Sequence, residues 1–144
     1  MNKQMSLSFI HDELKEVKTH KREFLEKMDA ILPWEQLYEL VKPCYYEGAR
    51  GNKPYDLELM LRIHLIQNLY DLSDEGTRNE IIDSRAFSDF CEVESSNQIP
   101  DGDTIGRFRN LLIQNHIHEQ FFAVVVKTLT DRGLILKKGT IVDS

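Results

Sequence analysis

One aspartate near the end of the chain has the position of a metal-binding carboxylate. Asp143 follows the run Thr140–Val142, whose residue types are typical of a β-strand. Ligand-binding residues commonly lie at the carboxyl ends of strands. Phosphoryl transfer with two metal ions, however, requires several carboxylates around ions about 3.5–4 Å apart. From spacing alone, the simpler interpretation of Asp143 is an exposed acid at the end of a strand.

The histidines and cysteines do not predict a catalytic or metal site. His116 and His118 are two residues apart, a spacing that points them to different faces of a helix. His64 lies in the most apolar segment, so we expect a satisfied histidine of the core or its boundary. Cys44 and Cys91 form no CxxC pair and indicate free thiols in a cytoplasmic protein.

The distribution of charge predicts which part of the chain would meet a nucleic acid. The net charge is −6, but residues 63–103 carry ten acidic and two basic side chains, whereas residues 104–144 carry three acidic and six basic ones. DNA affinity comes mainly from Lys and Arg side chains that neutralise phosphates. The acidic stretch should therefore be repelled by a duplex, which makes a short helix over 74–83 a poor recognition helix.

The segment TIGRFRNLL, residues 104–112, is the better candidate for contacting DNA. Its apolar residues predict an inward face, with Arg107 and Asn110 outward and Arg109 beside them. Arg pairs with guanine and Asn with adenine in the major groove. The alternative for each residue is a solvated charge, and for Arg109 an ion pair with the acidic stretch. The DNA backbone would be held by basic residues of a loop, namely Arg50, Lys53 and, as a further candidate, Lys42.

The spacing of apolar residues predicts a mainly α-helical fold. Pro43 is expected to stop the second helix, and a loop is expected from Lys42 to Tyr55. The triple Val124–Val126 could instead be a strand, although its context favours helix. Helices are expected over 12–32, 34–41, 57–70, 74–83, 104–112 and 116–131, with a further turn or two over 85–91.

Capping residues predict where several of these helices begin and end. Asp56 is expected to cap the central helix, and Ser73 the short helix that follows it. Either Asp103 or Thr104 is expected to cap the helix over 104–112. Gly133 is expected to end the last helix.

The C-terminal segment has a different character from the helical part. Residues 134–144, LILKKGTIVDS, contain two short β-prone runs around a Lys-Lys-Gly turn and predict a hairpin. A lone hairpin is marginal in water, so we expect it to be mobile or paired with another chain. The predicted organisation is an N-terminal helix or arm over 1–33, a compact helix-turn-helix-like domain of about six helices over 34–133, and the hairpin over 134–144.

Several strings in the sequence resemble the N-terminal region of bacterial insertion-sequence transposases of the DDE class, in the InsH-like group. They are ILPWEQLYELVKPCYY, GNKPYDLELMLRIHLIQNLYDLSDEG, IPDGDTIGRFRNLL and GLILKKGTIVDS, which occur in order between Phe24 and Ser144. The chain departs from the pattern at Asn52, where relatives more often have Arg, and this weakens the basic loop.

The resemblance implies a role for Asp143 and also a limit on what the chain can do. In that family GTxVD is the first strand of an RNase H-like catalytic domain, and its Asp is the first of three catalytic carboxylates that bind magnesium. Asp143 matches this residue, whereas the other two acids would lie beyond Ser144. The expectation is therefore a chain truncated after the first catalytic aspartate, inactive by itself, and needing no cofactor of its own.

Two functional hypotheses follow from the resemblance. In the first, the chain is the DNA-binding and assembly part of a transposase, and it binds terminal inverted repeats for DNA transposition. In the second, it is a non-catalytic module that self-associates or joins intact transposase and inhibits it. In both, no membrane is involved, because no apolar run reaches the roughly 18–20 residues of a membrane span.

Overall fold

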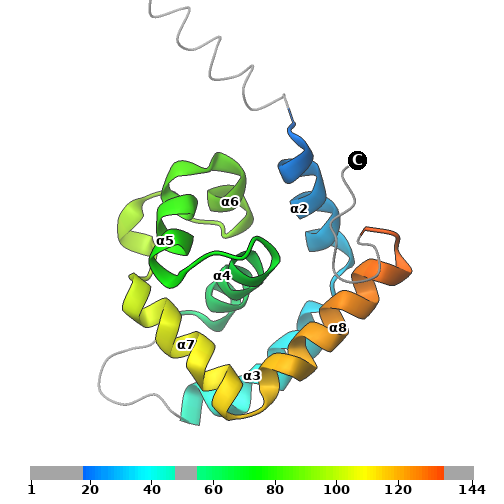
Figure 1. Cartoon of the computed structure of the whole chain (residues 1–144), viewed down its shortest axis with the longest axis vertical. Helices are drawn as coiled ribbons and strands as arrows, with labels where there is room; N and C mark the ends of the chain where they lie inside the picture. Colours follow the sequence, from blue (N-terminus) through cyan, green and yellow to red (C-terminus); the bar gives the residue numbers. More distant parts are fainter. Residues whose placement is uncertain (1–17, 48–54, 135–144) are drawn as a thin grey trace, which may run out of the picture.

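The computed structural model describes residues 18–47 and 55–134, and within these ranges the chain is helical, with no β-strand. The mainly α fold expected from the sequence is therefore confirmed, whereas the predicted hairpin lies almost wholly outside the described residues. Figure 1 shows α4 in the middle, α5 and α6 on one side of it, and α2, α3 and α8 on the other. The helices are α2 (His20–Ile31), α3 (Trp34–Glu47), α4 (Leu57–Leu69), α5 (Asp74–Asp83), α6 (Arg85–Phe90), α7 (Gly102–Gln114) and α8 (Ile117–Asp131), with a short 3-10 helix at Ser96–Gln98.

Helix α4 is the centre of the hydrophobic core, as its apolar sequence predicts. Eight of its thirteen residues are buried, because neighbouring helices surround it on several sides. Asp56 occupies the N-cap position as expected, but its side chain makes no capping hydrogen bond. The large side chains that are fully buried come from α2, α3, α4, α5, α6 and α8, and include Leu25, Leu37, Leu65, Ile81, Phe87 and Phe121.

The first two helices differ from the sequence prediction at their ends. Helix α2 begins at His20, because Thr19 is extended and its side chain accepts a hydrogen bond from the Arg22 amide at 3.2 Å. Helix α3 does not stop at Pro43 but continues through it to Glu47. Pro43 removes one backbone donor and disfavours the helix locally. The turn nevertheless persists where Tyr45 packs edge-on against Phe108 of α7, with ring centroids 5.6 Å apart.

Side-chain caps define the starts of α5 and α7. The Ser73 hydroxyl accepts a hydrogen bond from the Gly76 amide at 2.9 Å, which confirms the predicted cap. The prediction for α7 was wrong, because the cap is neither Asp103 nor Thr104. Asp101 accepts a hydrogen bond from the Thr104 amide at 2.8 Å, so the helix begins at Gly102.

Helix α8 confirms the last predicted helix and excludes the strand alternative for Val124–Val126. His116, with φ of 59°, forms the turn between α7 and α8. At the other end, Gly133 has φ of 72° and donates from its amide to the Thr130 carbonyl, as in a Schellman motif. Gly133 therefore terminates the helix as predicted. No helix in the described ranges is long and apolar enough to cross a membrane.

Candidate nucleic-acid interface

Helix α7 divides its side chains between the core and the solvent as the sequence predicts. Ile105, Phe108 and Leu112 are buried, whereas Arg107 and Asn110 are exposed. These two polar residues are three positions apart and therefore lie on neighbouring turns of one outer face. The arrangement leaves a guanidinium and an amide available on the same side of the helix.

Arg109 is not available in the same way, because it is held by α5. Its Nε donates to Asp74 Oδ1 at 3.1 Å and its Nη2 donates to Asp74 Oδ2 at 2.8 Å, a bidentate ion pair that is about two thirds buried. Arg109 thus follows the alternative that the sequence left open, a pair with the acidic stretch. A contact between Arg109 and DNA stays a prediction, and the ion pair makes Arg109 a candidate for positioning α7.

The carboxylate of Asp74 joins three helices. Besides Arg109 of α7, it accepts a hydrogen bond at 2.7 Å from Nε2 of the buried Gln67 of α4. The hydrogen bond from Arg109 is the main reason that the pKa of Asp74 is lowered, with partial burial acting in the opposite direction. The same contact raises the pKa of Arg109. The pair is therefore fully charged at neutral pH.

Arg109 also acts on its neighbour on α7. Its Nη1 donates to Asn110 Oδ1 at 3.3 Å. This contact fixes which end of the Asn110 amide points toward Arg109, and it leaves the amide nitrogen with its two N–H groups as donors. Asp74 therefore positions Arg109, and Arg109 orients Asn110.

Two glycines allow α5 and α7 to approach closely. A Cβ atom at Gly106 would lie 2.6 Å from Asp74 Oδ2, and one at Gly102 would lie 2.2 Å from Glu75 Oε2 and 3.3 Å from the Glu75 Cα. A side chain at either position would therefore have to displace a carboxylate of α5, and one at Gly102 would also crowd the α5 backbone. The glycines therefore bring the acidic first turn of α5 against the outer face of α7.

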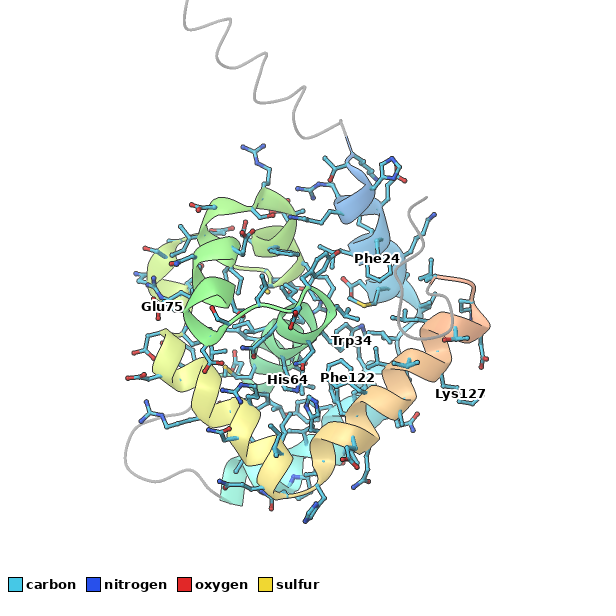
Figure 2. All side chains as sticks on the ribbon, in the orientation of Figure 1. Phe24, Trp34, His64, Glu75, Phe122 and Lys127 are labelled. Atoms are coloured by element: carbon cyan, nitrogen blue, oxygen red, sulfur yellow. The ribbon has the colours of Figure 1, made fainter. Side chains whose placement is uncertain are left out.

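This approach forms a shallow hollow of mixed charge on the surface between α5 and α7. Glu75 lies on α5, and Figure 2 shows it at the edge of the molecule near α7. The hollow is lined by Asp74, Glu75, Gly102, Asp103, Gly106, Arg107 and Asn110. It offers one amide, together with one guanidinium and two carboxylates that form no ion pair with a described residue. Its chemistry therefore suits a ligand that carries both hydrogen-bond donors and acceptors.

Among the remaining predicted site residues, only Lys42 belongs to the described part of the chain, and it does not line this hollow. Lys42 is exposed on α3, with its Nζ 5.7 Å from the centroid of the Tyr38 ring. Arg50, Lys53 and Asp143 lie outside the described residues. In the described part of the chain, no three His, Cys, Asp or Glu side chains come together to hold a metal ion.

The structure reveals a histidine pair that the sequence does not predict. His64 is buried, as predicted, but its Nε2 lies 3.0 Å from Nδ1 of His118 on α8. The rings of Phe108, Phe121 and Phe122 surround His64 with centroids 5.5–5.8 Å away, and Figure 2 shows His64 and Phe122 in the interior. The two histidines are 54 positions apart, so no local spacing could have revealed the contact.

Burial strongly affects the histidine pair and one cysteine. Burial lowers the pKa of His64 to about 3, with further contributions from the nearby His118 and Arg109. The pKa of His118 is also lowered by burial. Burial raises the pKa of the Cys91 thiol to about 12, and neither Cys91 nor Cys44 forms a disulfide, in agreement with the predicted free thiols.

Comparison with known families agrees with this helical domain. The sequence model of the family described as Transposase domain (DUF772) matches residues 12–111, which include α2 to α6 and most of α7. The chain therefore belongs to this transposase-domain family. No solved structure matches it.

Proposed function

We propose that this chain is the DNA-binding and assembly part of an insertion-sequence transposase of the DDE class, and that α7 contacts the terminal inverted repeats. Membership in the transposase-domain family supports a transposase-derived protein. The observation that carries the DNA-binding proposal is the exposure of Arg107 and Asn110 on one face of α7, above a buried apolar face. These are the two side-chain types that most often pair with guanine and adenine in the major groove.

The support from Arg109 and Asp74 is indirect. Because their ion pair ties α7 to α5, the outer face of α7 has a fixed orientation relative to the rest of the domain. A rigid helix is a better frame for base contacts than a loop, because small displacements weaken hydrogen bonds to base edges. The proposed direct contacts are therefore Arg107 and Asn110, with Arg109 as a positioning residue and Arg50, Lys53 and Lys42 as candidate backbone contacts.

Quantitative binding to DNA tests this proposal. The affinity of the chain is measured for a duplex carrying the inverted repeat that flanks its gene and for a scrambled duplex, at two salt concentrations. We expect a preference that survives at the higher salt, since base contacts depend less on ionic strength than phosphate contacts. Equal affinity for both duplexes would refute the proposed recognition of inverted repeats.

A substitution in α7 tests the assignment of the helix. We expect Arg107→Ala to reduce the preference for the repeat by about 1–3 kcal/mol, the usual value of a bidentate base contact. Arg132→Ala is the matched control, because Arg132 is also exposed but follows α8. If both variants weaken binding to both duplexes by the same small factor, Arg107 contacts only phosphate or solvent.

Self-association is the second candidate function. Among the described residues, α7 and α8 each expose a large apolar side chain, Ile113 at 47% and Val126 at 39%. Such residues are more often found at contacts between chains when they form a patch. Sedimentation without DNA separates the two functions, because a stable oligomer with no preference for the repeat supports a non-catalytic interaction or inhibitory module.

A further inference from the structure

Two carboxylates share the α5–α7 hollow with the proposed DNA contacts. Asp103 and Arg107 both belong to the outer face of α7, while Glu75 reaches the same hollow from α5. Neither carboxylate forms an ion pair with a described residue, and both are exposed. Asp74 differs from them, because Arg109 balances its charge and both Arg109 and Gln67 donate hydrogen bonds to its carboxylate.

These carboxylates distinguish between the two parts of DNA that could approach α7. Phosphate groups carry negative charge and only accept hydrogen bonds, so Glu75 and Asp103 repel them. Base edges in the major groove also present donors, namely the amino groups of cytosine and adenine, and carboxylates accept from these groups. The hollow is therefore chemically suited to base edges and poorly suited to the DNA backbone.

We infer that Glu75 and Asp103 are specificity-determining residues of the α7 interface, which weaken binding to DNA of the wrong sequence. This inference rests on the proposed function of α7. Non-specific binding comes almost entirely from phosphate contacts. A carboxylate beside the recognition residues lowers that background, whereas the correct sequence compensates with base amino groups that donate hydrogen bonds to the carboxylate. Specificity is a difference between two affinities, and a repulsive element increases it as much as an attractive one.

Neutral substitutions test the inference. The variants Glu75→Gln, Asp103→Asn and the double variant keep the size of each side chain and remove its charge. We expect each single variant to bind the scrambled duplex roughly two- to fourfold more tightly, the effect of one unit charge about 5–10 Å from a phosphate in water. Binding to the inverted repeat should change less or weaken, so the ratio of the two affinities falls in each variant and falls furthest in the double variant.

A control variant and two different negative results distinguish failure of the inference from failure of the proposed function. Glu39→Gln removes an exposed carboxylate from α3, outside the hollow, and should leave the ratio unchanged. An unchanged ratio in the double variant, with a circular dichroism spectrum like that of the wild type, overturns the inference while the proposed function stands. A wild-type chain that shows no preference for the repeat refutes the proposed function itself, and the inference with it.

Discussion

The ion pair between α5 and α7 leads to a prediction about the substitution Asp74→Asn. The carboxylate accepts hydrogen bonds from Arg109 Nε, Arg109 Nη2 and Gln67 Nε2. An asparagine offers one oxygen acceptor, and its amide nitrogen would face a donor. Hydrogen bonds to charged groups contribute about 1.5–3 kcal/mol each, whereas exposed ion pairs contribute about 0–1 kcal/mol. Since this pair is only two thirds buried, we expect a loss of about 1–3 kcal/mol in the free energy of unfolding.

The pH dependence of stability gives a second, independent test of the pair between Asp74 and Arg109. The pKa of Asp74 is lowered in the folded state, so the unfolded chain binds more protons between the lowered value and the ordinary value of 3.8. The contribution of Asp74 is therefore complete above the ordinary pKa and is lost as the pH falls through the folded pKa. The difference in stability between wild type and Asp74→Asn should be largest near neutral pH and should shrink in acid.

Urea unfolding followed by circular dichroism, at neutral pH and in acid, measures both effects. Asp83→Asn is the matched control, because Asp83 is exposed near the end of the same helix. We expect the control to change stability by less than about 0.5 kcal/mol. If Asp74→Asn is as stable as the wild type at neutral pH, the pair between Asp74 and Arg109 does not hold α5 against α7.

Two further predictions concern the core. Burial lowers the pKa of His64 to about 3, so between about pH 6.5 and 3 this histidine is protonated in the unfolded chain but not in the folded chain. The free energy of unfolding therefore decreases as the pH falls through this window. His64→Leu cannot bind this proton, so it should lose less stability between pH 7 and 4 than the wild type does. The control is His116→Asn, on an exposed histidine, which should lose as much as the wild type. Equal losses for all three proteins in urea titrations would contradict the lowered pKa of His64. Phe121 is fully buried, so Phe121→Ala should reduce the free energy of unfolding by about 3–5 kcal/mol, whereas Ile113→Ala, on an exposed residue, should have little effect. A small effect of Phe121→Ala in the same urea assay would show that α8 does not pack on the core as described.

The elements that the sequence predicted well are those whose signals are local. The apolar run of α4 and the cap at Ser73 depend on neighbouring residues, and both predictions were confirmed. The end of α3 was wrong because packing of Tyr45 on Phe108, a contact between distant segments, keeps the helix going beyond Pro43. The start of α7 was wrong because the cap is two residues before the first expected candidate, Asp103.

The candidate site was predictable only in part. The apolar period of α7 correctly placed Arg107 and Asn110 on the outer face, since burial follows helical geometry. The apolar pattern of α7 could not predict the partner of Arg109, because the ion pair with Asp74 depends on how closely α5 approaches α7. The charge distribution predicts that DNA avoids the acidic residues near position 75, whereas the structure places Glu75 in the same hollow as Arg107. The pairing of His64 with His118 joins segments that no motif connects.

In α7, the residues that pack against the rest of the domain are different from the residues on the outer face. Gly102 and Gly106 lie against α5, where an added Cβ would meet the carboxylates of Glu75 and Asp74. Arg107, in contrast, is exposed on the outer face, so a substitution there leaves the two glycines and the buried apolar residues of α7 unchanged. If α7 contacts DNA as we propose, a substitution at position 107 would change the contacting side chain while the packing of α7 on α5 stayed the same.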